Sequence, residues 1–333
     1  MKNPTETKLI DRYNRQLNYL RISITDRCNL NCIYCCPDER IPRLSHNDIL
    51  TYEEILRLVR IGNRLGISKL RITGGEPLVR KGVYEFLARL GEIKGIREVT
   101  LTTNGVSLPN HLDRIWSAGI RRINISLDTL KPDKFAQITG SDRFGKVWAG
   151  IVSALKMGFK PVKLNVVALR GLNDDELIDF ARLSLEHPLH VRFIEYMPIG
   201  KCRMKFGPPL LVPEIKSKVQ KLGPMSPVER NADDGPAQRY KIEKAPGEIG
   251  FISALSHHFC STCNRLRLTA SGQLRPCLLS DRQIDLKKAL RSGRSDRELT
   301  DLFLQAVKHK PSDHHIDIDD HSGVSCQMSS IGG

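Results

Sequence analysis

The chain has 333 residues, of which 40% are hydrophobic, and its formal net charge at pH 7 is +15. This length and composition predict a folded protein with one large domain or two smaller ones, and they exclude wholesale disorder. Residues 1–12 are polar and lack the apolar segment of a secretory signal, and no apolar run approaches the ~20 residues of a membrane span. We therefore expect a cytoplasmic protein with no membrane partner.

The positive charge suits a ligand that carries phosphate groups, such as a nucleic acid or a phosphorylated small molecule. The 52 lysines and arginines are scattered along the chain, without a long basic run or a low-complexity arm. This distribution favours a small anionic ligand, and we expect no nucleic-acid partner.

Six β-branched runs, each followed by a segment of helical periodicity, make up the first two-thirds of the chain. The runs cover residues 19–25, 69–73, 98–104, 122–128, 162–169 and 190–198. Thr51 with Glu54 forms a capping box ahead of one helix, and Asn173 with Glu176 repeats the same signal ahead of another. Alternating strands and helices predict a parallel sheet covered by helices, either a partial barrel or a doubly wound sheet.

A change in composition near residue 200 predicts a domain boundary. Prolines become frequent between residues 200 and 247, which makes regular elements sparse there. We expect a core domain over residues 1–200 and a smaller domain over residues 201–333. In parallel sheets the active site lies at the carboxyl ends of the strands, and the first cysteines and a Gly-Gly-Glu-Pro turn at 74–77 follow two of these ends.

The first cysteine group has the spacing C-x3-C-x2-C, formed by Cys28, Cys32 and Cys35. Structural zinc usually takes four ligands in paired knuckles, whereas three thiolates on a four-iron cluster leave one iron open to an external ligand. The spacing therefore favours an iron–sulfur cluster and leaves zinc as the alternative.

The second cysteine group, C-x2-C-x13-C, consists of Cys260, Cys263 and Cys277. His257 and His258 lie just upstream, so a zinc site with three cysteines and one histidine is the alternative here. Arg265 and Arg267 alternate along the following segment and should project to one side, where guanidinium groups suit an anionic substrate. The three remaining cysteines, Cys36, Cys202 and Cys326, are expected to be ordinary thiols.

These motifs resemble those of two nested families. The spacing of the first cysteines, with Tyr34 before the last of them, and the Gly-Gly-Glu-Pro turn are similar to the signature of the radical S-adenosylmethionine (SAM) superfamily. The second cysteine group and the terminal Gly332-Gly333 pair resemble the GTP 3′,8-cyclase family, over nearly the whole chain. The resemblance implies an α/β fold: a partial (β/α)6 TIM-like radical SAM barrel, with a smaller C-terminal domain that carries a second cluster.

The resemblance also implies cofactors and site residues. Cys28, Cys32 and Cys35 would hold a first [4Fe-4S] cluster, and Cys260, Cys263 and Cys277 a second. The SAM contacts would be Tyr34, Gly75, Ser126 and Met197. The GTP contacts would be Arg21, Arg71, Thr102, Lys163, Arg265 and Arg267, with Arg192 a further candidate. Arg265, Arg267, Gly332 and Gly333 would take part in catalysis.

The implied reaction is the first step of molybdenum cofactor biosynthesis, catalysed by a lyase. SAM splits into methionine and a 5′-deoxyadenosyl radical, which removes the 3′ hydrogen of the GTP ribose. The ribose radical then attacks carbon 8 of guanine and gives 3′,8-cyclo-7,8-dihydro-GTP. Expected partners are an electron donor such as flavodoxin or ferredoxin, cyclic pyranopterin monophosphate synthase and a second copy of the chain in a homodimer. A radical SAM enzyme that modifies peptides or RNA is the alternative.

Overall fold

The computed structural model describes residues 8–35, 43–197, 199, 208–229, 234–314, 324 and 328–332. Cys36, Cys202, Cys326 and Gly333 lie outside the described residues. All the described strands belong to one twelve-stranded sheet, in the order β12-β11-β10-β1-β2-β3-β4-β5-β6-β9-β8-β7.

The centre of the sheet is a row of six parallel strands that follow one another in the sequence. They are β1 (Tyr19–Ser23), β2 (Lys69–Thr73), β3 (Glu98–Thr103), β4 (Ile123–Ser126), β5 (Val162–Ala168) and β6 (Leu189–Glu195). Each strand overlaps one of the six β-branched runs, so the predicted alternation of strands and helices is confirmed.

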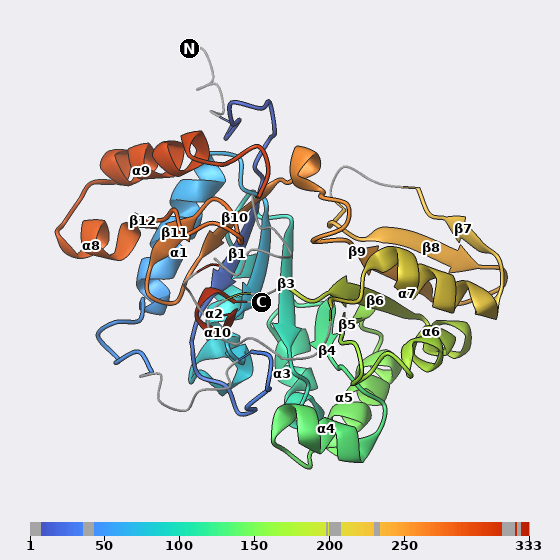
Figure 1. Cartoon of the computed structure of the whole chain (residues 1–333). Helices are drawn as coiled ribbons and strands as arrows, with labels where there is room; N and C mark the ends of the chain where they lie inside the picture. The colour runs from blue at the N-terminus through green and yellow to red at the C-terminus, as the bar shows by residue number, and fades with distance from the viewer. Residues whose placement is uncertain are drawn as a thin grey trace.

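Helices connect these strands and cover the outer face of the curved sheet (Figure 1). They are α1 (Tyr52–Arg64), α2 (Val83–Gly91), α3 (Leu112–Ser117), α4 (Pro132–Thr139), α5 (Phe144–Lys156) and α6 (Leu177–Glu186), with the short 3-10 helices η1 (Pro77–Val79) and η2 (Leu108–Asn110). Parallel strands need crossover connections of this length, because the chain must return to the same end of the sheet.

The remainder of the chain extends both edges of the same sheet. On one edge β9 (Glu248–Ile252) pairs in parallel with β6, and β8 (Gln238–Ile242) and β7 (Met225–Pro227) follow in antiparallel order. On the other edge β10 (Arg265–Leu268) pairs in parallel with β1, followed by β11 (Gln273–Arg275) and β12 (Ile284–Asp285). The helical elements of this part are α7 (Val212–Val219), η3 (Gln220–Leu222), η4 (Cys260–Thr262), α8 (Leu286–Arg291), α9 (Asp296–Lys308) and α10 (Met328–Ile331). The division at residue 200 stays a prediction.

The two faces of the sheet differ in chemistry. Along β5, Val162, Leu164 and Val166 are fully buried, while the residues between them are only partly buried. Successive side chains of a strand point to opposite faces, so the apolar set packs against the helices and the polar set, Lys163 and Asn165, turns to the inside of the barrel. The inside is therefore built to surround a polar ligand.

The two predicted capping boxes have different outcomes. Thr51 and Glu54 form one at the start of α1, as expected. The prediction for Asn173 and Glu176 is wrong, because α6 begins at Leu177 without a side-chain cap. Asn173 Nδ2 instead donates to the carbonyl oxygens of Asp128 and Val167 over 2.7 and 2.8 Å, and its Oδ1 accepts from Leu169 N. Asn173 is fully buried, so it serves tertiary structure rather than the helix end.

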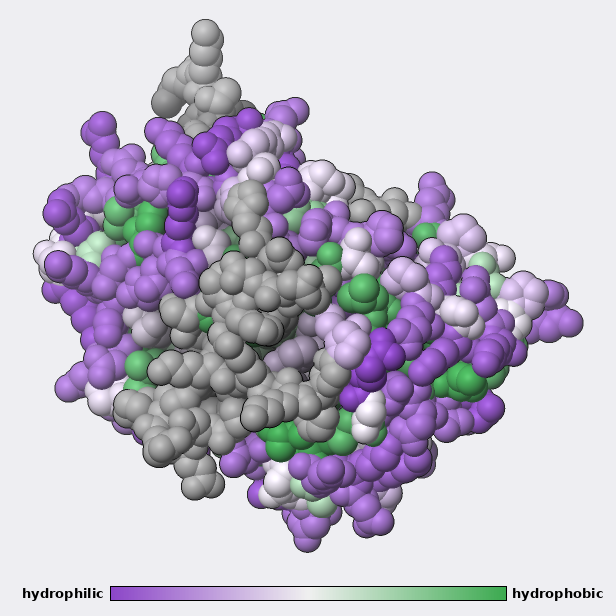
Figure 2. Space-filling model, in the orientation of Figure 1, coloured by the Kyte–Doolittle hydropathy of each residue, from purple (hydrophilic) through white to green (hydrophobic). Residues whose placement is uncertain are grey.

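The surface drawn in Figure 2 is mostly hydrophilic over the described residues. In the described part of the chain, the large apolar side chains with clear exposure are Ile10, Tyr13 and Val79. None of the helices among the described residues is both long enough and apolar enough to cross a bilayer.

The Asn173 contacts give a test of stability. We expect Asn173→Ala to lower the free energy of unfolding by about 3 kcal/mol, because it leaves buried backbone groups without partners. Asp179→Ala on α6 is the control: its ion pair with Arg182 is about half exposed and should contribute less than about 1 kcal/mol. Both can be measured by urea unfolding, and equal losses in the two variants would contradict the structural role of Asn173.

Candidate active site

A cavity of about 770 Å³ lies inside the barrel and is lined by residues of β1 to β6, β9 and β10. It brings together fourteen of the residues that the sequence singled out, but Cys260, Cys263, Cys277 and Gly332 are not among its lining residues. Those on its wall are Arg21, Cys28, Cys32, Tyr34, Cys35, Arg71, Gly75, Thr102, Ser126, Lys163, Arg192, Met197, Arg265 and Arg267. The second cysteine group lies beside the cavity, next to Arg265.

The first cysteine loop follows β1 and is held against α4. Backbone hydrogen bonds join Asn31 to Thr139 and Ile33 to Ile138, each over 2.9 Å. Burial raises the pKa of the Cys32 thiol well above its ordinary value, and the nearby Cys35, Asp128 and Cys28 raise it further. Three thiols thus crowd together where thiolates would repel one another, so a positively charged metal core fits this group.

The thiols of neither cysteine group gather around one point, as the ligands of a single metal ion would. Over the ranges that the structure describes, no three His, Cys, Asp or Glu side chains gather around one point that a metal ion could occupy. Ligands of a four-iron cluster bind separate irons and need not converge in this way. The thiol donors therefore suit iron–sulfur chemistry.

In the turn after β2, the backbone at Gly75 lies close to that of Arg27, and the carboxylate of Glu76 is buried. A Cβ on Gly75 would lie 2.5 Å from the carbonyl oxygen of Arg27, so the turn needs glycine at this position. Glu76 is fully buried and accepts hydrogen bonds from Thr103 Oγ1 over 2.8 Å and Asn104 N over 2.6 Å. Burial raises the pKa of Glu76 to about 7, against these hydrogen bonds, which lower it.

Asn104 connects this turn to the first cysteine group. Its Nδ2 lies 3.7 Å from Cys28 Sγ and donates to Asn29 Oδ1 over 2.7 Å. Glu76 thus orders the end of β3, and Asn104 orders the cysteine loop. The sequence places both residues at strand ends but carries no signal for this contact.

Tyr34 is fixed at the end of β4 by Asp128. The Tyr34 hydroxyl donates to Asp128 Oδ2 over 2.5 Å, and Asp128 Oδ1 accepts from Val167 N over 2.8 Å. Burial raises the pKa of Asp128 to about 6 and that of Tyr34 well above its usual value. Tyr34 therefore remains protonated, and the loop is anchored beside Cys35.

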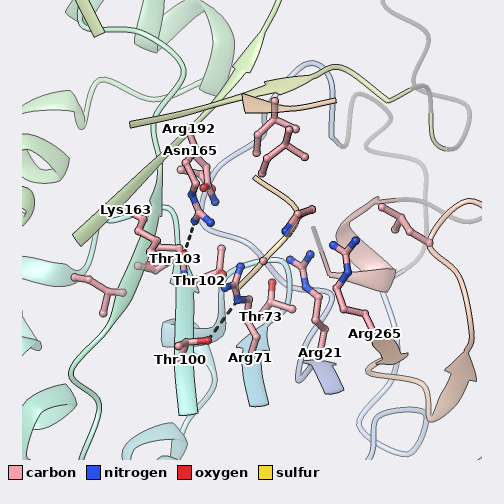
Figure 3. A pocket seen from close by; sticks show the side chains of 18 of the residues that line it. Arg21, Arg71, Thr73, Thr100, Thr102, Thr103, Lys163, Asn165, Arg192 and Arg265 are labelled. Atoms are coloured by element: carbon pink, nitrogen blue, oxygen red, sulfur yellow. Dashed lines mark hydrogen bonds between the residues drawn. The ribbon is translucent and has the colours of Figure 1, made fainter. Parts of the chain in front are cut away.

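A belt of cations crosses the inside of the barrel. The sheet register places Arg21 of β1 directly between Arg71 of β2 and Arg267 of β10. Figure 3 shows Arg21, Arg71 and Arg265 on one side of the cavity and Arg192 on the other. Arg192 donates to Asn124 Oδ1 over 2.5 Å, and Arg71 Nε donates to Thr100 Oγ1 over 3.4 Å.

Burial and mutual repulsion lower the pKa values of side chains in this belt. Burial, and then the charges of Arg192 and Arg71, lower the pKa of Lys163 to about 6. Burial also lowers the pKa of Arg192 and of Arg267 to about 9, and their neighbours Arg71 and Arg265 add to the effect. A bound polyanion would relieve this repulsion.

Several buried polar atoms of the same wall lack a hydrogen-bond partner among the described residues. They are Thr102 Oγ1, Asn165 Oδ1, Arg192 Nε and the hydroxyl of Tyr19. Buried polar groups are normally satisfied, so these atoms point to a polar ligand in the cavity. Tyr19 and Asn165 were not among the sequence-predicted contacts, and only their alternation with known inward positions could have indicated them.

The second cysteine group lies at η4 and just after β11. Burial alone would raise the pKa of the Cys263 thiol, but Arg265 and Lys310 outweigh it and lower the pKa to about 6. Burial raises the pKa of Cys260, and the nearby Cys277 and Cys263 add to the rise. The three thiols are therefore close to one another, and Cys263 is poised to bind metal as a thiolate.

One of the two histidines considered as a fourth ligand, His258, has other contacts. His258 is exposed, and its ring packs edge-on against His314 with centroids 4.0 Å apart. Both rings lie within hydrogen-bond distance of the carbonyl oxygen of Ala254, at 3.3 and 2.8 Å. His258 therefore takes part in packing at the edge of the second cysteine group.

Near the end of the chain, α10 and Gly332 return to the carboxyl ends of β1 and β2 (Figure 1). Gly332 is buried, and its carbonyl oxygen accepts from Arg267 NH1 over 2.9 Å. A Cβ on Gly332 would lie 2.6 Å from Thr73 Cγ2, and the φ of +73° also favours glycine. The preceding residue, Ile331, is buried with Ile199. Gly333 lies outside the described residues.

Two family models cover most of the chain. The Radical SAM superfamily model matches residues 22–184, and the model described as Molybdenum Cofactor Synthesis C matches residues 189–316. Among solved structures, SuiB of Streptococcus suis bound to S-adenosylmethionine aligns with a TM-score of 0.62 at 15% identity, over 84% of this chain and 67% of that chain. This likeness shows the partial radical SAM barrel.

Curated relatives are similar over nearly their full length. The GTP 3′,8-cyclase of Moorella thermoacetica is 50% identical over 92% of this chain and 95% of its own. That of Heliobacterium modesticaldum is 49% identical over 98% of this chain and 100% of its own. The GTP 3′,8-cyclase of Pelotomaculum thermopropionicum is 49% identical, with 92% and 95% covered. The chain belongs to the GTP 3′,8-cyclase family.

Proposed function

We propose that this chain converts GTP to 3′,8-cyclo-7,8-dihydro-GTP, the first step of molybdenum cofactor biosynthesis. The observation that carries the proposal is the single cavity, which joins the first cysteine group to a belt of buried cations and to the arginines beside the second group. The relatives named as GTP 3′,8-cyclases support the same activity.

Each cysteine group holds one [4Fe-4S] cluster in this proposal: Cys28, Cys32 and Cys35 the first, and Cys260, Cys263 and Cys277 the second. When bound, the clusters and SAM supply the one-electron and radical chemistry of the reaction. The protein supplies thiolates, and Asn104 steadies Cys28 while Arg265 favours the thiolate of Cys263. Burial in the cavity also limits water near the reacting atoms.

SAM would be held by residues of the first cysteine loop and of the ends of β2, β4 and β6. The proposed contacts are Tyr34, Gly75, Ser126 and Met197, all on the cavity wall. Gly75 has no side chain to obstruct the ligand, and the bond of Tyr34 to Asp128 fixes the loop beside it. These residues orient the cofactor rather than react with it.

GTP is bound across the cationic belt. Arg21, Arg71, Lys163, Arg265 and Arg267 offer charge-assisted hydrogen bonds to the triphosphate, and Thr102 offers an unpartnered hydroxyl. Arg192, buried within the belt, is a further contact. The carbonyl oxygen of Gly332 accepts from Arg267 at the cavity wall, and we assign Gly332 and Gly333 a part in placing the substrate.

The wider setting of the enzyme is part of the proposal. We assign a flavodoxin or ferredoxin as electron donor, cyclic pyranopterin monophosphate synthase as the recipient of the product, a cytoplasmic location and a homodimeric state. We also divide the chain into a core domain (1–200) and a C-terminal domain (201–333), even though their strands share one sheet.

Iron content tests the two clusters. Anaerobically purified protein should hold about eight irons and eight sulfides per chain. Replacing Cys28, Cys32 and Cys35 by Ala should remove about half of this iron and abolish SAM cleavage, while the second cluster remains. Stoichiometric zinc at Cys260, Cys263 and Cys277 would refute the second cluster.

Proton uptake tests the GTP site. At pH 8 the amine of Lys163 is mostly neutral, since its pKa is lowered to about 6. A bound triphosphate favours the charged amine and raises this pKa, so GTP binding should take up a proton. Calorimetry in two buffers with different ionisation enthalpies measures the uptake. Lys163→Met should remove it and weaken GTP binding about ten- to a hundredfold.

The Lys163 experiment has two controls, a variant at Lys160 and a measurement at lower pH. Lys160→Met changes an exposed lysine ahead of β5 and should keep both the uptake and the affinity. Below pH 5 the amine of Lys163 is already charged, so uptake by the wild-type protein should vanish there. Equal uptake by the wild type and by Lys163→Met at pH 8 would place the triphosphate elsewhere.

Gly332→Ala tests the end of the chain. The added Cβ meets Thr73 and strains a positive φ, so it should displace the tail and suppress cyclisation about a hundredfold. GTP binding and iron content should persist, and uncoupled 5′-deoxyadenosine should accumulate. Gly293→Ala carries a similar φ of +77° without close neighbours and serves as the control. Wild-type product formation by Gly332→Ala would remove the tail from the mechanism.

A further inference from the structure

Lys310, two residues beyond the end of α9, is a buried lysine beside the second cysteine group. Its relative exposure is 2%, and its Nζ makes three short contacts. Nζ lies 3.5 Å from Cys263 Sγ, and donates to the carbonyl oxygens of Arg265 over 2.9 Å and Pro276 over 2.7 Å. An ammonium group has three donors, so these contacts match its full capacity.

The three contacts join the segment after α9 to both ends of the antiparallel pair β10–β11. Cys263 and Arg265 belong to the segment entering β10, while Pro276 immediately precedes Cys277 after β11. One ammonium group therefore links the backbone two residues after Cys263 with the backbone directly before Cys277. Burying a lysine is costly, and this cost is offset only where every donor is satisfied, as it is here.

Arg15 fixes the segment that carries Lys310. Its guanidinium donates to the carbonyl oxygens of Pro311 over 2.6 Å and Ser312 over 3.0 Å, and also to that of Cys260 over 2.6 Å. Asp11 Oδ2 accepts from Arg15 Nε over 2.7 Å and holds the guanidinium in place. Arg15 and Lys310 together thus reach all three cysteine segments.

We propose that Lys310 is a positioning residue for the second cluster, which holds the Cys263 and Cys277 segments together and donates a hydrogen bond to the Cys263 sulfur. The proposal rests on the assignment of that cluster to Cys260, Cys263 and Cys277. A positive donor at a ligand sulfur stabilises the more negative, reduced state of the cluster. Lys310 therefore raises the reduction potential of the second cluster relative to the same cluster without it.

The decisive variant is Lys310→Met, which keeps much of the side-chain volume but removes the charge and the donors. Lys308→Met is the matched control, because Lys308 is exposed in the last turn of α9. Both are made in the full chain in which Cys28, Cys32 and Cys35 are replaced by Ala, so that the second cluster alone is observed. After anaerobic reconstitution, iron and sulfide are measured and the cluster is titrated by electron paramagnetic resonance.

Lys310→Met should either lose the second cluster or keep it with a redox equilibrium shifted at least tenfold toward the oxidised state. That shift corresponds to about 59 mV for a one-electron couple. Lys310→Arg, which retains charge and donors, should restore most of the iron and of the potential. The first cluster, measured in the chain with Cys260, Cys263 and Cys277 replaced by Ala, should be unchanged by Lys310→Met.

Unchanged iron and potential in Lys310→Met, relative to Lys308→Met, would overturn the proposal. If Lys310→Met does not fold, the chain with Cys28, Cys32 and Cys35 replaced by Ala, with Lys310 intact and with ¹⁵N-labelled lysines, is measured instead. Pulsed resonance of its reduced second cluster should show a nitrogen coupling, and absence of the coupling would overturn the proposal equally. Failure of the underlying assignment looks different, because replacing Cys260, Cys263 and Cys277 by Ala would then leave the full iron content.

Discussion

The repulsion among buried cations inside the barrel is the constraint on which the site depends. Arg21, Arg71, Lys163, Arg192 and Arg267 line one cavity. Burial and the charges of neighbouring cations lower the pKa of four of them, Arg21, Lys163, Arg192 and Arg267. A protein tolerates such an arrangement when a ligand of opposite charge completes it. Apolar packing between the central strands and the helices offsets this cost, as along β5, where Val162, Leu164 and Val166 are fully buried.

The two cysteine groups lie in opposite electrostatic surroundings. The first is surrounded by carboxylates and other thiols, and the pKa of Cys32 is raised. The second is surrounded by Arg265 and Lys310, and the pKa of Cys263 is lowered. Positive neighbours favour extra electron density on a cluster, and negative neighbours oppose it. A cluster at the first group would therefore give up an electron more readily than a cluster at the second.

Periodicity and motif spacing predict the central fold well, because they report local structure. The six parallel strands and the capping box at Thr51 follow from such signals. The pairing of β9 with β6 and of β10 with β1 does not follow from them, because the local sequence of a short strand does not determine which strand it pairs with. Asn173 illustrates the limit: its type and spacing suit a helix cap, and only tertiary contacts decide its real use.

The residues of the candidate site also differ in whether the sequence alone reveals them. The cysteines and the glycine turn are visible in sequence because their spacing is itself the requirement of the chemistry. Tyr19, Asn104, Asp128 and Lys310 are visible only once distant strands and loops are brought together. Lys310 in particular resembles any lysine at a helix end until its burial is known.

The pairing of β1 with β10 affects the order in which the strands can pair during synthesis. Tyr19 pairs with Arg265, and β1 receives its second neighbour only after most of the chain has left the ribosome. Until then β1 and β6 are both edges of an unfinished parallel sheet, with backbone groups that invite pairing with other chains. Such long-range pairing also slows folding. The second cysteine group lies at this late junction, so its three thiols come together only after the segment that pairs with β1 has been made.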